Sequence, residues 1–342
     1  MMSTILVTGG TGYIGSHTTV ELLDAGMEVV IIDNLENSKK EVLDRITGIT
    51  GKAPKFEEVD LRNRTATFEV FEKYPDIEAV IHFAAYKAVG ESVEKPLAYY
   101  ENNLFSLVNL LEAMKKFNVA NIVFSSSCTV YGQPEKIPVS EDAPIQVATS
   151  PYGNTKQIGE EILRDVIAAD SGIKVISLRY FNPVGAHVSA KIGELPLGVP
   201  ANLVPFITQT VIGIREQLSV FGDDYDTPDG SAIRDYINVV DLARAHVVAI
   251  RRLIENRQKK SLEVFNLGTG TGLSVLEVIK AFESATGEKV NYKIVARREG
   301  DVEKVYADTR FANEELGWKA EIGIEETLRS AWNWEKSLRN LT

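Results

Sequence analysis

The chain has 342 residues and a formal net charge of −11, with 37 Lys and Arg against 48 Asp and Glu. Its 44% hydrophobic and 25% charged residues are typical of a soluble globular protein with about two domains. A chain this acidic binds phosphate backbones poorly, so we expect no nucleic-acid partner. The single cysteine, Cys128, and four scattered histidines exclude an internal disulfide framework, and we expect no metal site.

Targeting signals are absent from the sequence pattern. No run of 18 apolar residues occurs, and the N-terminus lacks a basic segment followed by an apolar one. We therefore expect no membrane partner and a cytoplasmic protein.

Strands and helices are expected to alternate through the first half of the chain. Short apolar runs predict strands at 5–8, 28–33, 56–59, 79–83, 122–125 and 175–180. Helical spacing predicts helices at 17–25, 65–74, 97–117 and 154–169. Nearly continuous apolar strands that alternate with helices are typical of a parallel sheet covered on both faces. The expected class is therefore α/β, with a Rossmann-type doubly wound sheet.

The composition changes after Pro183. Residues 184–205 are rich in glycine and proline, which predicts a loop and a domain boundary. We therefore expect a first domain over 1–183 and a smaller mixed α/β domain over 184–342. The later half holds predicted helices at 241–255 and 274–285 and a strand at 264–267. It is too fragmentary for an independent sheet, so we expect about 235–267 to pack back on the first domain.

A glycine-rich turn follows the first predicted strand. Gly9, Gly12 and Gly15 open the next helix, where they let the backbone approach a pyrophosphate and the helix N-terminus offers its N–H groups. This GxxGxxG spacing differs from the usual GxGxxG, and a plain strand–helix turn is the alternative. Asp33, 24 residues after Gly9, ends the second strand, where a carboxylate accepts ribose hydroxyls and repels a 2′-phosphate. The combination favours NAD over NADP.

Two further polar groups stand near predicted strand and helix ends. Tyr152 and Lys156 are four residues apart and share one helix face, so the ammonium is expected to lower the pKa of the phenol. A positively charged nicotinamide would lower it further and give a general base near neutral pH. The serines of 125–127 end the fifth strand, at the edge where open α/β sheets bind ligands. An ordinary helix start and a helix cap are the alternatives.

Several sequence blocks carry a family resemblance over residues 4–335. They are GGTGYIG, HFAAYKAVGES, SSSCTVYG, SPYGNTK, RYFNPVGAH, RDYINVVDLA and REGDV. Together they resemble the extended short-chain dehydrogenase/reductase family, and within it the UDP-glucose 4-epimerase (UDP-galactose 4-epimerase) branch. The resemblance implies an isomerase for UDP-hexoses: NAD, tightly bound and recycled in each turnover, oxidises C4, and the hydride returns to the opposite face of a 4-keto intermediate. It also implies a homodimer in which helices near 97–117 and 152–170 form a four-helix bundle.

The same resemblance assigns the site residues. Tyr152 and Lys156 correspond to the catalytic pair, and Ser127 to the serine of the triad. The implied cofactor contacts are Gly9, Gly12, Tyr13, Ile14, Gly15, Asp33, Asn34, Asn37, Ser38, Asp60, Leu61, Phe83, Ala84, Ala85, Lys87, Asn103, Ser125, Tyr152, Lys156 and Tyr180. The implied substrate contacts are Ser127, Tyr152, Phe181, Asn182, Asn202, Leu203, Val220, Phe221, Arg234, Arg298 and Asp301. The two arginines suit a diphosphate as fork donors, although surface arginines are the alternative.

Two other functions are compatible with this fold. A nucleotide-sugar 4,6-dehydratase typically needs an Asp-Glu pair after the fifth strand, where this chain has Cys128 and Thr129, which protonate a leaving hydroxyl poorly. A noncatalytic NAD-sensing protein would not need Tyr152 and Lys156. Both features favour the epimerase.

The resemblance also bears on substrate breadth. A bulky tyrosine close to the sugar's 2-substituent tends to exclude N-acetylated sugars, and the matching position here is Val305. We therefore expect room for UDP-GlcNAc and UDP-GalNAc. An alignment shifted by one residue would place Tyr306 there and remove that expectation.

Overall fold

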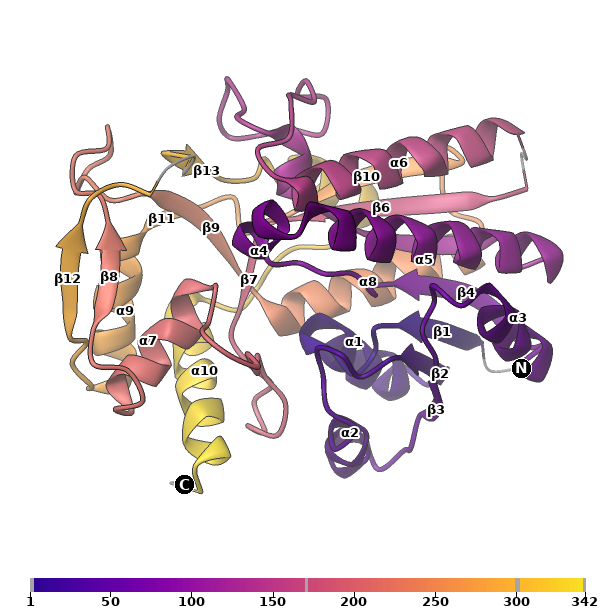
Figure 1. The fold of residues 1–342 in the computed structure, drawn as a ribbon, viewed down its shortest axis with the longest axis horizontal. Helices are drawn as coiled ribbons and strands as arrows, with labels where there is room; N and C mark the ends of the chain where they lie inside the picture. Colours follow the sequence, from indigo (N-terminus) through magenta and orange to yellow (C-terminus); the bar gives the residue numbers. More distant parts are fainter. Residues whose placement is uncertain (1–2, 170–171, 299–301, 341–342) are drawn as a thin grey trace.

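The computed structural model describes residues 3–169, 172–298 and 302–340. Among these residues, seven strands form one sheet in which every neighbouring pair is parallel. Their order is β10-β6-β5-β4-β1-β2-β3 (Figure 1). The strands are β1 (Thr4–Thr8), β2 (Glu28–Asp33), β3 (Lys55–Glu58), β4 (Ile77–His82), β5 (Asn121–Ser127), β6 (Lys174–Tyr180) and β10 (Leu262–Leu267).

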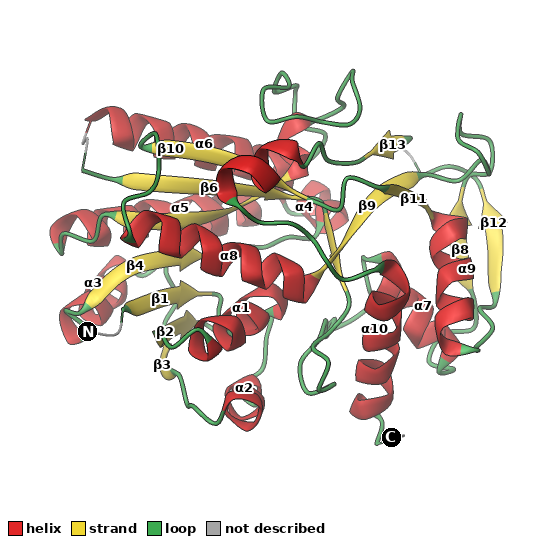
Figure 2. Ribbon diagram, turned by 180° about the vertical axis from the view of Figure 1, so that it is seen from behind, coloured by secondary structure: helices red, strands yellow, loops and turns green. Residues whose placement is uncertain are grey.

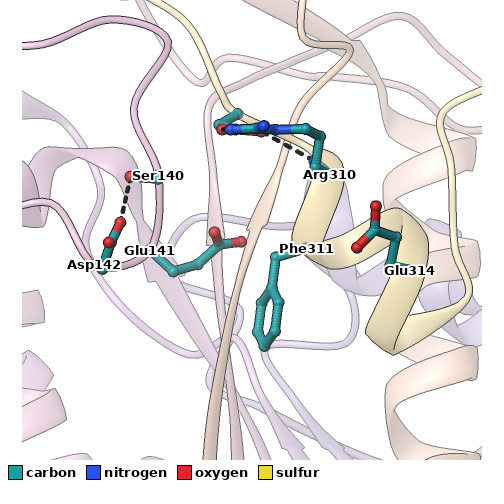
Figure 3. Close-up of a pocket in the computed structure, with 7 residues that line it drawn as sticks. Ser140, Glu141, Asp142, Arg310, Phe311 and Glu314 are labelled. Atoms are coloured by element: carbon teal, nitrogen blue, oxygen red, sulfur yellow. Dashed lines mark hydrogen bonds and ion pairs between the residues drawn. The ribbon is translucent and has the colours of Figure 1, made fainter.

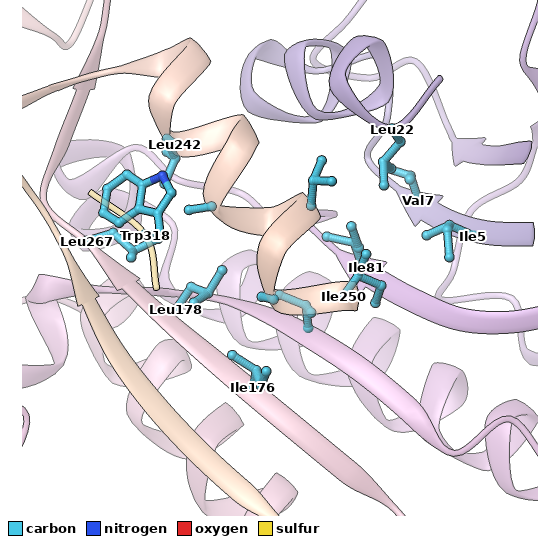
Figure 4. Close-up of a cluster of buried hydrophobic side chains, with 14 of the residues drawn as sticks. Ile5, Val7, Leu22, Ile81, Ile176, Leu178, Leu242, Ile250, Leu267 and Trp318 are labelled. Carbon is cyan, nitrogen blue, oxygen red and sulfur yellow. The ribbon is translucent and has the colours of Figure 1, made fainter. Parts of the chain in front are cut away.

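Helices cover both faces of this sheet because successive strand residues point to opposite sides. Ile5 and Val7 of β1 pack toward α1 and α8, in the cluster drawn in Figure 4, whereas Leu6 packs toward α3, α5 and α6. The helices are α1 (Tyr13–Asp24), α2 (Val42–Thr50), α3 (Arg64–Lys73), α4 (Val89–Glu94), α5 (Pro96–Lys116), α6 (Pro151–Ala169) and α8 (Val239–Ile254). The predicted Rossmann-type α/β class is therefore confirmed.

The remaining elements lie beyond the carboxyl ends of the main strands (Figures 1 and 2). One small sheet has the order β11-β9-β13 with β7 on β9, and β12 pairs with β8. A separate apolar cluster joins α7, α9 and α10. The elements are β7 (Asn182–Val184), α7 (Leu203–Val211), β8 (Leu218–Phe221), β9 (Ile233–Asn238), β11 (Gly272–Ser274), α9 (Val275–Thr286), β12 (Tyr292–Val295), β13 (Lys304–Val305) and α10 (Ile324–Leu338). Two short helices remain. The first, η1 (Cys128–Tyr131), follows β5, and the second, η2 (Ala312–Leu316), packs against α8 and β10 of the main sheet.

Some predicted boundaries are wrong. The loop predicted to run to residue 205 ends earlier, because α7 begins at Leu203 and tolerates Pro205 in its first turn, where no intrahelical N–H bond is lost. Helix α6 begins at Pro151 rather than 154, with proline at the first helical position. Tyr152 therefore lies in the first turn of α6.

The segment around 235–267 contributes to both the main sheet and the small sheet around β9. Helix α8 packs against α1, and β10 pairs with β6 at the edge of the main sheet. Strand β9 instead pairs with β7, β11 and β13. The division of the chain at residue 183 stays a prediction. Every helix of the described ranges is too short or too polar to cross a bilayer.

Candidate active site

The turn between β1 and α1 leaves no room for side chains. A Cβ on Gly9, whose φ is +70°, would lie 2.8 Å from the backbone nitrogen of Ala84, and one on Gly15 would lie 2.2 Å from the carbonyl oxygen of Gly9. The turn therefore packs directly against the chain that leaves β4. Helix α1 has Gly12 as its N-cap and no acidic residue in its first turn. Such a helix end attracts an anion, so the turn fits the pyrophosphate of a dinucleotide.

The carboxylate of Asp33 faces this turn from the end of β2. Its Oδ2 accepts a hydrogen bond from Thr11 N at 3.2 Å, and its Oδ1 accepts from Leu35 N at 2.9 Å and Ser38 Oγ at 3.1 Å. Asp33 is 9% exposed. The carboxylate is thus held in one orientation and keeps lone pairs for further hydroxyl donors, which is what the ribose of NAD requires.

The predicted cofactor residues lie after the carboxyl ends of neighbouring strands. Arg62 Nη2 donates to Asp60 Oδ2 at 2.6 Å and holds the pKa of this carboxyl below its usual range. Asn103, inside α5, donates to Thr155 Oγ1 at 3.0 Å and to the carbonyl of Tyr86 at 3.1 Å. The other members are Tyr13 and Ile14 at the start of α1, Asn34, Asn37 and Ser38 after β2, Leu61 after β3, and Phe83, Ala84, Ala85 and Lys87 after β4.

Side-chain contacts join this region to the second half of the chain. Tyr13 donates its hydroxyl hydrogen to the carbonyl of Gly185 at 2.7 Å. Lys87 forms an ion pair of 3.1 Å with Glu194, whose same oxygen accepts from Asn202 Nδ2 at 2.6 Å. Glu194 therefore connects a predicted cofactor residue to a predicted substrate residue. The sequence analysis missed Glu194, which no motif marks.

Ser127, Tyr152 and Lys156 meet at the end of β5. Lys156 Nζ donates to the carbonyl oxygen of Ser125 at 2.6 Å and lies 6.0 Å from the centroid of the Tyr152 ring. Ser127 hydrogen-bonds Tyr152, and its Oγ accepts from Thr129 N at 3.2 Å. The structure thus brings the three residues of the predicted triad to the edge where the glycine turn also lies.

The pKa of the Tyr152 phenol lies above its ordinary value, whereas the sequence analysis expected Lys156 to lower it. Burial raises the pKa of Tyr152 to about 12, and the hydrogen bond from Ser127 opposes this only in part. Burial lowers the pKa of Lys156 to about 8, against the charge of Glu160, which raises it. The lowering predicted from Lys156 does not overcome burial, because desolvation of the phenolate dominates. The further lowering predicted from a positively charged nicotinamide stays a prediction. A base at neutral pH needs a further positive charge beside the ring.

Aromatic side chains close this edge of the sheet. Tyr180 shares a hydrogen bond with Ser125, and its ring centroid lies 5.9 Å from that of His246. The ring of Phe83 lies 4.7 Å from His246. Burial lowers the pKa of His246 to about 4, so this imidazole is neutral. Tyr180 and Phe83, both predicted cofactor residues, therefore pack against the same side chain, His246, to which the sequence analysis assigned no role.

The predicted substrate residues come from separate elements. Arg234 of β9 is close enough to Cys128 for its charge to oppose the burial that raises the thiol pKa to about 12, which places Arg234 near the end of β5. The Arg298 guanidinium lies 5.5 Å from the centroid of Phe221, which is 41% exposed on β8. Asp301 lies outside the described residues. The rest are Phe181 after β6, Asn182 in β7, Asn202 and Leu203 at the start of α7, and Val220 in β8.

A separate open pocket of about 390 Å³ lies elsewhere on the surface (Figure 3). Within the described chain, its lining includes no predicted site residue. The lining consists of Ser140, Glu141, Asp142, Asp308, Arg310, Phe311 and Glu314.

Comparison with known proteins agrees with this geometry. A family model described as GDP-mannose 4,6 dehydratase matches residues 6–331. The UDP-glucose 4-epimerase of Bacillus subtilis is 54% identical over 333 residues, 97% of each chain. That of Homo sapiens is 51% identical over 342 residues, 98% of this chain and 97% of the human one.

A solved structure is similarly close. The UDP-glucose 4-epimerase from Bifidobacterium longum, in complex with NAD+ and UDP, matches with a TM-score of 0.94 and 49% identity, covering 99% of this chain and 100% of that one. The resemblance to the extended short-chain dehydrogenases/reductases is thereby confirmed, and the chain belongs to their UDP-glucose 4-epimerase branch, within the family that the GDP-mannose 4,6 dehydratase model describes.

Proposed function

We propose that the protein interconverts UDP-glucose and UDP-galactose by inverting C4 of the hexose. The observation that carries this proposal is the meeting of Ser127, Tyr152 and Lys156 beside the glycine turn that fits a dinucleotide. Bound NAD supplies a hydride acceptor that later returns the hydride, so the reaction has no net oxidation. The membership in the epimerase branch supports the same reaction.

The chain's own residues handle the proton and the substrate. Tyr152 Oη removes the proton from the sugar 4-hydroxyl, and Ser127 Oγ hydrogen-bonds the same oxygen and relays the proton. Lys156, held on the Ser125 carbonyl, keeps a positive charge beside the phenol. Residues of the second half, with Arg234 and Arg298 as diphosphate donors, anchor UDP while the 4-keto sugar turns about its diphosphate linkage. Binding energy on the nonreacting nucleotide leaves the sugar free to rotate.

A product assay without added cofactor tests this function. UDP-galactose labelled with deuterium at C4 should give UDP-glucose with the label retained, as read by NMR. A stable 4-keto product would indicate a dehydratase, and the absence of turnover would indicate a noncatalytic NAD-binding protein. The dehydratase is disfavoured because burial raises the pKa of the Cys128 thiol to about 12, and Thr129 is no acid at neutral pH.

Acceptance of N-acetylated UDP-sugars is the first testable consequence. Val305 is 9% exposed, pairs with Arg234 in the sheet and belongs to the same apolar cluster as Phe181. Tyr306 instead packs against Gly272, so the side chain of Val305 is the one we place beside the sugar. We expect comparable kcat/KM for UDP-galactose and UDP-GalNAc, and at least about a 10-fold loss for UDP-GalNAc alone in Val305→Tyr. Equal losses for both sugars in that variant would contradict the assignment.

A homodimer that forms through α5 and α6 is the second testable consequence. Leu97, Phe105 and Val108 of α5 are 80%, 57% and 41% exposed, and a second copy would cover them. We expect a mass of two chains by light scattering and a mass of one chain for Phe105→Glu. Val147→Glu, at a loop residue that is 90% exposed, is the control and should keep the mass of two chains. A parent protein of single-chain mass would contradict the dimer.

A further inference from the structure

The middle serine of 125–127 belongs to a buried polar network rather than to the substrate edge. Ser126 Oγ donates to Glu160 Oε1 at 2.6 Å, and Ser177 Oγ donates to the same oxygen at 3.0 Å. Arg179 completes the set, with Nε at 2.9 Å from Oε1 and Nη2 at 2.5 Å from Oε2. Glu160 and Arg179 are each 4% exposed. One carboxylate of α6 therefore receives donors from both β5 and β6.

The network continues away from α6. Arg179 Nη1 donates to the Tyr131 hydroxyl at 2.9 Å, and that hydroxyl donates to Asn266 Oδ1 at 2.7 Å. It thus joins α6, β5, β6, η1 and β10. A buried ion pair is tolerated only when its geometry satisfies both charges, so α6 has one favourable position on the sheet.

This anchor lies one helical turn from the catalytic lysine. Lys156 and Glu160 are four residues apart and share a face of α6. Their contacts on β5 are also adjacent, since Lys156 binds the Ser125 carbonyl and Glu160 binds the Ser126 hydroxyl. Two successive turns of the helix are therefore fixed to two successive strand residues.

We propose that Glu160, held by Arg179, is a positioning residue that fixes α6 against β5 and so places Tyr152 and Lys156 against Ser127 and Ser125. The inference rests on the proposed function, because its role is to position the general base of that reaction. Glu160 acts through Lys156 and not on the substrate. A displacement of about 1 Å in such a group is enough to lower turnover strongly.

The charge of Glu160 has a second consequence. It raises the pKa of Lys156, whereas burial lowers it to about 8. The other titratable groups on the elements around Lys156 carry no net charge. Burial keeps the histidines and tyrosines neutral, and these are His82 of β4, Tyr99 of α5, Tyr152, Tyr180 of β6 and His246 of α8. The remaining charges form ion pairs, Arg179 with Glu160 and Glu91 of α4 with Lys95. Removal of the Glu160 charge should therefore let Lys156 lose its proton at lower pH.

The variant Glu160→Gln tests the inference against a matched control. Glu263→Gln removes a carboxylate from another buried ion pair, with Arg252 at 2.6 Å, which joins β10 to α8. Both variants should lose thermal stability. Only Glu160→Gln should lower kcat for UDP-galactose, by about 10- to 100-fold at unchanged KM. Its alkaline limb in the pH–kcat profile should also move down by about one unit.

The outcomes separate the two proposals. If Glu160→Gln has the same kcat as Glu263→Gln and the same alkaline limb in its pH–kcat profile, Glu160 is merely structural and the inference is overturned. If Glu160→Gln does not fold, Ser126→Ala decides, because it removes one hydrogen bond and leaves the ion pair whole. It should lower kcat several-fold, and an unchanged kcat overturns the inference. A parent protein that does not epimerise would instead contradict the proposed function.

Discussion

Replacement of Tyr152 by phenylalanine is expected to lower kcat for UDP-galactose by about 10²- to 10⁴-fold while NAD stays bound. The phenol is the group that hydrogen-bonds Ser127, and the variant deletes only its oxygen. The ring remains, so the packing at the start of α6 is preserved. Turnover is measured by NMR, and NAD is assayed after its release by denaturation.

Tyr100→Phe is the matched control for this experiment. Tyr100 lies on α5 and accepts a hydrogen bond from Asn154 Nδ2 of α6 at 2.8 Å, so the control deletes a phenolic oxygen that contacts the same helix. Its kcat should stay within about 3-fold of the parent value, since the loss of one part-buried hydrogen bond has a small net effect. Full activity in Tyr152→Phe would mean that another group is the base.

Substitution of Gly15 by alanine is expected to abolish NAD retention and to lower the free energy of unfolding by about 3 kcal/mol. The added Cβ would lie 2.2 Å from the carbonyl oxygen of Gly9 and 2.9 Å from the Cα of Gly10, both backbone atoms that cannot move without the turn. The turn must therefore open, which displaces the N–H groups that face the pyrophosphate. Thermal unfolding and the NAD content of the purified protein measure both effects.

Gly90→Ala provides the comparison, because a Cβ there meets nothing within 4 Å and the residue lies in α4. We expect unchanged or slightly higher stability and a full complement of NAD, since alanine favours a helix by about 0.5–1 kcal/mol over glycine. A Gly15→Ala protein that retains NAD as well as this control would show that the turn does not form the cofactor site.

The serines that end β5 show which contacts the sequence could predict and which it could not. Their position at a strand end predicted polar contacts, but the pattern gave no reason to separate one serine from the next. In the structure Ser125 contacts Tyr180, Ser126 contacts Glu160, and Ser127 contacts Tyr152. Those partners lie 25 or more positions away along the chain, and only the register of β5 against its neighbours brings them together.

The electrostatics of the site show the same limit. Spacing correctly predicted that Tyr152 and Lys156 share a helix face, yet it gave the wrong direction for the pKa of the phenol. Burial of the ring raises this pKa to about 12, and burial is produced by residues from distant segments. Likewise no motif predicted that Arg62 pairs with the carboxylate of Asp60 in the structure.

By itself the sequence determined the order of strands and helices, the doubly covered parallel sheet, the family and the chemical groups at the strand ends. These follow from local periodicity and from motifs, which a chain carries wherever it folds. Only the tertiary structure decided which side chains meet: Glu160 with Ser126 and Arg179, Glu194 with Lys87 and Asn202, and Val305 rather than Tyr306 beside Arg234 and Phe181. Such contacts depend on strand register and on burial, which are properties of the packed molecule and not of any segment alone.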